Sequence, residues 1–163
     1  MTLYKLKLIK EMYMFSEKCE RAIQKAFKLM EEECPVYVTG EDFLNSKATK
    51  NFWKLRLANR KNEQFDILFL NNQHQQLACE TLFKGTIDAA SVHPRVVIQR
   101  ILHHNAAAVI LGHNHPSGIS LPSIADKKIT DKLKSACAAI DVRVLDHIIV
   151  GTDIYSFSES GDM

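Results

Sequence analysis

Residues 106–126 read AAAVILGHNHPSGISLPSIAD and join a short apolar run to a group of polar side chains. A continuous apolar run such as 106–111 is typical of a central strand that is buried on both faces. The stretch that follows contains proline and glycine and predicts a loop. Ser123 then predicts the start of a helix that runs to about Ala139. We therefore expect the polar group to lie at the carboxyl end of a central strand.

His113 and His115 stand one residue apart directly after the apolar run. Side chains of an extended backbone alternate between faces with a period of two, so both imidazoles point to the same side. Asp126 would add a carboxylate and leave a fourth position open to water. That set is typical of catalytic zinc, because structural zinc is closed by four protein ligands. We predict one zinc ion per chain, held by His113, His115 and Asp126.

Ser123 and Asp126 also have a purely structural interpretation. They form a capping box, in which the serine caps the helix and Asp126, at the third helical position, reaches back to the amide of the cap. Histidine pairs also occur as packing or surface residues. The chain's own frequencies of His, Ser and Asp make the four-position pattern a coincidence of roughly one in a thousand such sequences. We therefore favour the metal interpretation.

The spacing H-x-H, seven residues, Ser, two residues, Asp is the JAMM signature, and with it the chain resembles the JAB/MPN metallopeptidases. Six segments are similar to one branch, the RadC-family JAB domains: Glu63–Phe65, Lys84–Ile87, Val92–Arg95, Ala106–Leu111, His113–Gly118 and Leu145–Gly151. The resemblance runs from about Val36 to the end of the chain. It implies the JAB/MPN fold, with a layout similar to that of cytidine deaminases, and a zinc-dependent peptidase or isopeptidase.

The resemblance also implies roles for residues outside the ligand set. JAMM enzymes use a glutamate on an upstream strand to carry the proton of the attacking water, and the matching position is Glu63, fifty residues before His113. Glu80, on the next predicted strand, is the alternative. Ser123 would hydrogen-bond the developing oxyanion. We thus expect a water activated by zinc and Glu63, with Ser123 as the second catalytic residue.

Four further residues near these motifs have mainly structural interpretations. Asn114 is expected to face away from the metal. Gly118 is expected to take a positive φ in the loop. Asp146-His147 resembles a family motif, and we interpret it as a structural pair in a strand, with support of a metal ligand from outside the ligand set as the alternative.

The order of predicted elements indicates an α/β domain with one mixed central sheet between helices. Strands are expected at 65–70, 77–83, 106–111, 142–150 and 154–157, and helices at 94–104 and from Ser123. The JAB/MPN domain would span 36–163, after a helical N-terminal extension at 1–35.

The N-terminal part of the chain predicts two helices. Apolar residues recur at helical spacing within 16–33, and Cys34-Pro35 ends that helix. A short extended piece at 36–38 precedes a second helix that opens at 39–42. Its buried side is expected to contain Phe43, Leu44, Phe52 and Leu55.

Composition and charge restrict the partners. The chain has 163 residues, of which 46% are hydrophobic and 25% charged, as in a globular domain. The net charge of +2 and the absence of a clustered basic stripe give no support for a nucleic-acid partner, so we expect a peptide or protein substrate. No run of 18 apolar residues and no signal peptide is present, which predicts a cytoplasmic protein without a membrane partner. Nothing in the sequence indicates an oligomeric state.

The spacing of the four cysteines rules out one further function and leaves two to compare. The cysteines have no C-x-x-C spacing, which predicts free thiols and excludes the zinc site of base deaminases. The first function is zinc-dependent hydrolysis. The second is an accessory role in DNA repair or recombination without proteolysis, which the name of the RadC family implies. Longer RadC proteins carry a helix-hairpin-helix region whose hairpin needs glycines. The first glycine here is Gly40, so we do not expect that region in this sequence.

Overall fold

The computed structural model describes residues 25, 46–58, 60–85 and 92–163. Apart from residue 25, the predicted helix at 16–33 lies outside these ranges, as do the extended piece at 36–38 and the start of the second helix, and all three stay predictions. The same holds for the boundary between the 1–35 extension and the 36–163 domain. Within the described residues, no helix is both long and apolar enough to cross a membrane.

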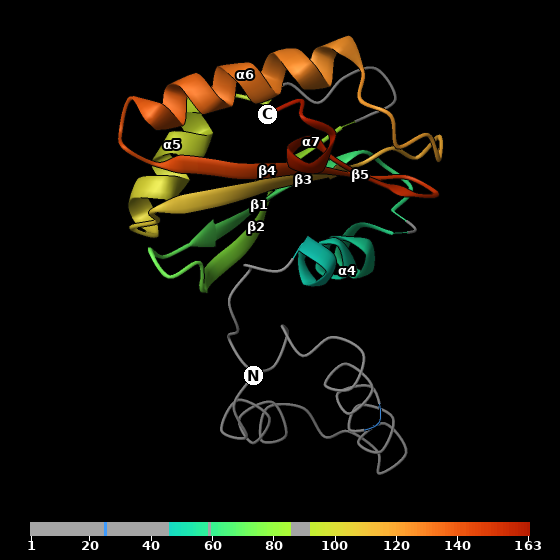
Figure 1. Cartoon of the computed structure of the whole chain (residues 1–163), viewed down its shortest axis with the longest axis horizontal. Coiled ribbons are helices and arrows are strands. Elements are labelled where there is room, and N and C mark those ends of the chain that lie inside the picture. Colours follow the sequence, from blue (N-terminus) through green and yellow to red (C-terminus); the bar gives the residue numbers. More distant parts are fainter. Residues whose placement is uncertain (1–24, 26–45, 59, 86–91) are drawn as a thin grey trace. The chain divides into compact units, whose positions relative to one another are not determined.

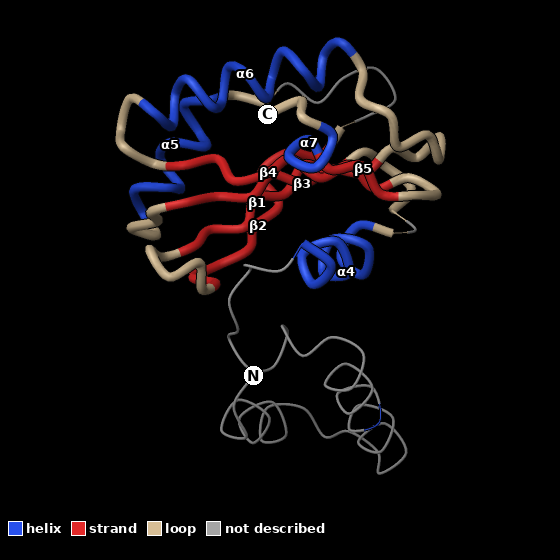
Figure 2. Tube along the Cα trace, viewed as in Figure 1, coloured by secondary structure: helices blue, strands red, loops and turns tan. Residues whose placement is uncertain are grey.

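A five-stranded mixed sheet forms the centre of the described domain (Figure 2). The strands follow the order β2-β1-β3-β4-β5, in which β3 and β4 are parallel and all other neighbours are antiparallel. The bounds are β1 Gln64–Leu70, β2 Gln76–Lys84, β3 Ala108–Asn114, β4 Arg143–Val150 and β5 Ile154–Ser156. The α/β class, the mixed sheet and the predicted order of elements are confirmed.

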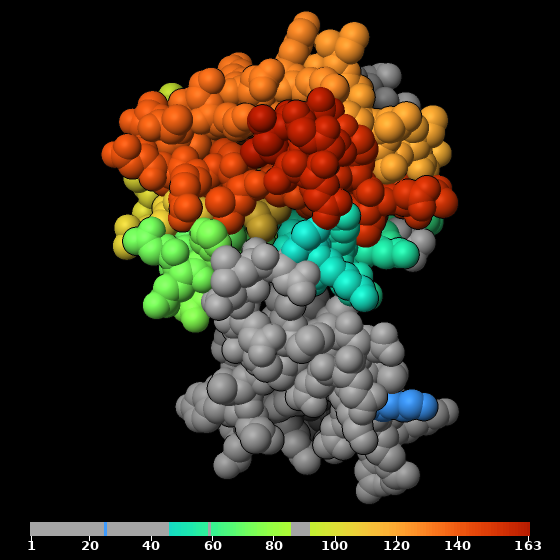
Figure 3. Space-filling view, viewed as in Figure 1, coloured from blue at the N-terminus to red at the C-terminus, as the bar shows by residue number. Residues whose placement is uncertain are grey.

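Helices cover both faces of this sheet (Figure 1). The bounds are α4 Ser46–Leu57, α5 Pro94–His103, α6 Ile124–Ala138 and α7 Phe157–Ser160. Helices α5 and α6 lie on one face, and α4 lies on the other. Helix α6 joins the parallel strands β3 and β4, which need such a crossover because a tight turn cannot connect them. In the space-filling view the C-terminal residues, in red, lie against α6, in orange (Figure 3), and Lys127 pairs there with Asp162 at 2.9 Å.

The main core lies between the sheet and helices α5 and α6. Every second residue of β1 and β3 faces this layer, as the period of two requires. The buried members include Phe65, Ile67 and Phe69 of β1, Val109 and Leu111 of β3, Val97 and Ile101 of α5, and Leu133 and Cys137 of α6. On the other face Gly112 of β3 leaves room for Trp53 of α4, since a Cβ at position 112 would come within 2.4 Å of the indole ring.

Three details of the predicted elements were wrong. Leu55 is 57% exposed, because α4 turns Trp53 and Leu57 towards the sheet together with Phe52. Strand β3 begins at Ala108 and not at Ala106, and it continues through His113 to Asn114. The last strand ends at Ser156, because the Ser156 hydroxyl accepts a hydrogen bond from the amide of Glu159 and starts α7.

Glu80 connects β2, which forms one edge of the sheet, to α5. Its carboxylate accepts a hydrogen bond from Nε of Arg100 at 2.6 Å and lies 2.8 Å from Nε2 of His104. The hydrogen bond from Arg100 is the largest cause that lowers the pKa of Glu80 to about 2. The carboxylate is therefore charged and already paired at neutral pH.

We expect Gly112→Ala to lower the free energy of unfolding by about 1–3 kcal/mol, the usual cost of overpacking a core. The added methyl group would overlap the ring of Trp53. Urea denaturation followed by the fluorescence of Trp53, the single tryptophan of the chain, measures this cost. In a Trp53→Leu background, followed by circular dichroism, the same change should cost less. An equal cost in both backgrounds would contradict the contact.

We expect Glu80→Gln to destabilise the protein at neutral pH by about 1 kcal/mol, the upper range for a partly exposed pair. A carboxylate with a lowered pKa adds stability above its unfolded pKa of about 4.3, and that stability is lost as the pH falls towards 2. Urea denaturation at pH 6 and pH 3 should show the difference between wild type and variant shrinking with acid. In an Arg100→Gln background, Glu80→Gln should change the free energy of unfolding little at either pH. If Glu80→Gln in the wild-type background costs the same at pH 6 and pH 3, the pairing is refuted.

Candidate metal centre

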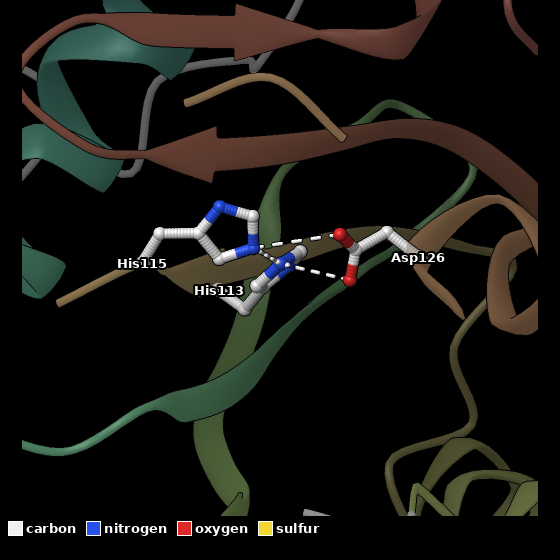
Figure 4. Close-up of side chains that lie close together, drawn as sticks. All are labelled: His113, His115 and Asp126. Carbon is white, nitrogen blue, oxygen red and sulfur yellow. Dashed lines mark hydrogen bonds and ion pairs between the residues drawn. The ribbon is translucent and has the colours of Figure 1, made fainter. Parts of the chain in front are cut away.

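His113 occupies the end of β3 on the face that carries α5 and α6. It stands opposite Phe65 in the β1–β3 register, and the two rings stack with centroids 5.9 Å apart. His113 is 1% exposed. His115 follows on the loop after the strand and is half-buried, while Asp126 is buried in the first turn of α6. Figure 4 shows the three side chains pointing towards one another.

The distances among these side chains suit one small cation. Nε2 of His113 lies 2.9 Å from Nε2 of His115 and 3.2 Å from Oδ1 of Asp126. Nε2 of His115 lies 3.4 Å from Oδ2 of Asp126. Two atoms bound tetrahedrally at about 2.1 Å from one zinc ion lie about 3.4 Å apart. The predicted ligand set therefore fits a zinc ion without a large rearrangement.

The loop after β3 sets which nitrogen of His115 faces the centre. Nδ1 of His115 lies 2.6 Å from the carbonyl oxygen of Ile119. A carbonyl oxygen only accepts, so the neutral ring carries its proton on Nδ1 and keeps the lone pair on Nε2. The hydrogen bond to Asp126 raises the pKa of His115, while burial lowers it to a smaller extent.

The two oxygens of Asp126 have different partners. Oδ2 accepts hydrogen bonds from the amide of Ser123 at 2.7 Å and from its hydroxyl at 2.6 Å, while Oδ1 faces His113. The amide of Asp126 donates to Oγ of Ser123 at 3.1 Å, so the capping box is complete. Burial raises the pKa of Asp126, but the neighbouring imidazoles of His113 and His115 outweigh it and hold the pKa well below its usual range. Capping and metal binding are thus compatible.

The loop between the ligands is fastened to the turn between β4 and β5. The amide of His115 donates to the carbonyl of Val150 at 2.9 Å, and the amide of Thr152 donates to the carbonyl of Gly118 at 2.7 Å. Gly118 has a φ of 84°, as its sequence context predicted. A Cβ at Gly151 would come within 2.4 Å of the carbonyl oxygen of Gly118. This close backbone contact holds the loop that carries His115.

Asn114 points away from the ligands, as expected, and binds the segment that carries Glu63. Its Oδ1 accepts a hydrogen bond from the amide of Gln64 at 2.9 Å, and its Nδ2 donates to the carbonyls of Arg60 and Asn62 at 3.3 and 3.2 Å. Asn114 is 3% exposed. The three bonds fix the backbone on both sides of Glu63.

Glu63 stands just before β1 and is half-buried. It lies two residues before Phe65, which is paired with His113, so continuing the antiparallel register brings Glu63 opposite His115. Glu63 is also the smallest of the causes that raise the pKa of His115. Glu80, the alternative, lies opposite Ile67 and is held by Arg100 and His104. This placement is consistent with Glu63 as the proton carrier, and that catalytic role stays a prediction.

The sequence interpretation underrated His147. Asp146 is structural, since its carboxylate accepts hydrogen bonds from the hydroxyl of Ser156 at 2.6 Å and the amide of Ser158 at 2.9 Å. His147 is completely buried, and its Nε2 lies 2.8 Å from Nδ1 of His113. Burial is the first cause that keeps the pKa of His147 well below its usual value. The only sequence signal for this role was the similarity of Asp146-His147 to a family motif. That similarity did not show which of the two residues contacts His113.

Comparison with known proteins identifies the same domain. Residues 43–162 match the RadC-like JAB domain. A UPF0758 protein of Vibrio cholerae serotype O1 is 44% identical over 151 residues, which are 91% of this chain and 94% of that protein. The UPF0758 protein YeeS of Escherichia coli strain K12 is 47% identical over 140 residues, 85% of this chain and 93% of that protein.

This chain covers only part of a longer relative. A UPF0758 protein of Vibrio cholerae serotype O1 strain M66-2 is 53% identical over 123 residues, which are 75% of this chain but only 55% of the relative. The described fold, the ligand geometry and the matched residues agree with one another. The chain belongs to the RadC-like JAB domain family.

Proposed function

We propose that this protein is a zinc-dependent hydrolase that cleaves a peptide or isopeptide bond. The observation that carries the proposal is that the Nε2 atoms of two imidazoles and the oxygens of one carboxylate lie within 3.4 Å of one another at the end of β3. When bound there, zinc supplies Lewis acidity and lowers the pKa of a coordinated water to about 7. Three ligands from His113, His115 and Asp126 leave one position open for that water.

Glu63 accepts the proton of the water and delivers it to the leaving amine in this proposal. Asn114 holds the backbone on both sides of Glu63, and the carbonyl of Glu63 accepts a hydrogen bond from the amide of Gly85 at 2.8 Å. A half-buried carboxylate opposite His115 is suitably placed for proton transfer at neutral pH. Glu80 is the less suitable base, because Arg100 stabilises its charged form and lowers its proton affinity.

Ser123 has a more restricted role in the proposal. Its hydroxyl donates to Oδ2 of Asp126, so it must turn away from that bond to stabilise an oxyanion. We retain it as the donor because it stands beside the ligand at the start of α6.

The free thiols of Cys79 and Cys137 support a reducing, cytoplasmic location.

We expect about one zinc per chain in the purified protein and a strong loss of zinc in His113→Ala and Asp126→Asn. Each change removes one of three ligands, and Asp126→Asn keeps an acceptor for the helix cap. Elemental analysis after dialysis against a weak chelator measures the occupancy. His103→Ala and Asp131→Ala are matched controls, since both residues are exposed and lie outside the ligand set. Full zinc occupancy in both ligand variants would mean that the zinc binds at another site.

We expect Glu63→Gln to keep zinc bound and to lower hydrolysis by a factor of about a hundred to ten thousand, as is usual when a general acid–base is lost. The amide keeps the shape of the side chain and leaves the ligands unchanged. Digestion of a peptide library and of isopeptide-linked ubiquitin-like conjugates, followed by mass spectrometry, provides the readout.

Glu80→Gln is the matched control for this experiment and should retain most of the activity. Loss of turnover in Glu80→Gln together with full turnover in Glu63→Gln would mean that the wrong strand has been assigned to the site. The repair hypothesis predicts a different result. A DNA-repair phenotype that survives Glu63→Gln would indicate a binding role without hydrolysis.

A further inference from the structure

His147 lies behind the metal centre in a closed environment of aromatic rings. It is completely buried on β4, its ring stacks on Phe157 with centroids 4.9 Å apart, and it meets the ring of Phe65 edge-on at 5.5 Å. Its two nitrogens have one partner each. Nε2 lies 2.8 Å from Nδ1 of His113, and Nδ1 lies 2.6 Å from Oγ1 of Thr130.

Thr130 fixes the direction of this chain of hydrogen bonds. Its hydroxyl lies 2.6 Å from the carbonyl oxygen of Asp126, one helical turn earlier in α6. The carbonyl only accepts, so the hydroxyl proton points to Asp126, and Oγ1 accepts from Nδ1–H of His147. Nε2 of His147 is then bare and accepts from Nδ1–H of His113. Nε2 of His113 is left without a proton, and it is the nitrogen that faces His115 and Oδ1 of Asp126.

We propose that Thr130 and His147 are positioning residues that hold the ring of His113 and fix the tautomer in which Nε2 is presented to a divalent cation. The proposal rests on the proposed metal site and extends it to residues that touch neither the cation nor the substrate. The reverse direction would place a proton on Nε2 of His113, pointing into the ligand set. Loss of a partner outside the ligand set commonly weakens metal affinity by 10- to 100-fold.

The test is the zinc affinity of variants, measured by competition with a chromophoric chelator. Thr130→Val keeps the shape of the side chain but removes the hydroxyl, and we expect it to weaken zinc binding by about 10- to 100-fold. Thr130→Ser restores the hydroxyl and should bind zinc within a factor of about three of wild type. His147→Phe fits between the aromatic neighbours, removes the acceptor for His113, and should weaken binding by a similar factor.

Helix α6 offers a matched control. The hydroxyl of Ser135 donates to the carbonyl of Asp131 one turn earlier, at 2.9 Å, and within the described part of the chain it has no hydrogen bond to a histidine. Ser135→Ala therefore removes the same kind of bond without disturbing the ligand set, and zinc affinity should not change. A general loosening of α6 would lower the affinity in this variant as well and would overturn the proposal.

Nitrogen NMR of the metal-free protein reads the tautomer directly. The ¹⁵N chemical shifts of His113 should show a protonated Nδ1 and a bare Nε2 in wild type, and a mixture of tautomers in Thr130→Val and His147→Phe. A protonated Nε2 in wild type, or unchanged shifts and zinc affinity in both variants, would overturn the proposal.

His113→Ala separates failure of this inference from failure of the proposed function. If His113→Ala loses zinc while the Thr130 and His147 variants bind it normally, the metal site stands and the positioning role is wrong. If His113→Ala binds zinc as wild type does, the metal site itself is wrong and the inference falls with it.

Discussion

The carboxylate of Asp126 belongs to the start of α6 and to the metal centre at the same time. One oxygen completes the capping box with Ser123, and the other faces His113. Successive residues of a helix are rotated by about 100° around its axis, so a start displaced by one residue would turn the carboxylate away from the histidines. The cap therefore sets both where the helix begins and where the third ligand points.

Strand β3 divides its last residues between two tasks because its side chains alternate. His113 points towards α6 and the ligand set, and Asn114 points to the other face and binds the backbone around Glu63. A register slip of one residue would exchange the two faces and lose both arrangements. The slip is opposed by the dense packing on each side, including the contact between Gly112 and Trp53. The packing that buries β3 therefore also keeps the site residues in position.

The sequence was sufficient for the features that local patterns determine. The ligand set lies within fourteen residues, so the alternation of a strand and the capping pattern of a helix place it without knowledge of the fold. The strands of the sheet were similarly recognisable from runs of apolar residues. The pairing of Glu80 with Arg100 and His104 was not, because it joins a strand and a helix that are adjacent only after folding. The burial of Leu57 in place of Leu55 likewise depends on how α4 is rotated against the sheet.

The sequence interpretation ranked this role of His147 second, for a reason that the sheet register explains. Val144 packs against the core on the α6 side, and strict alternation from Val144 would put Asp146 on that side and His147 on the other. The pairing of β3 with β4 instead shifts by one residue, from Val109 opposite Val144 to Ile110 opposite Asp146. Such an irregularity reverses the faces of all later residues. It sends Asp146 to the cap of α7 and His147 to the back of His113. A single extra residue in β4, invisible to periodicity, thus decides which member of the pair reaches the metal centre.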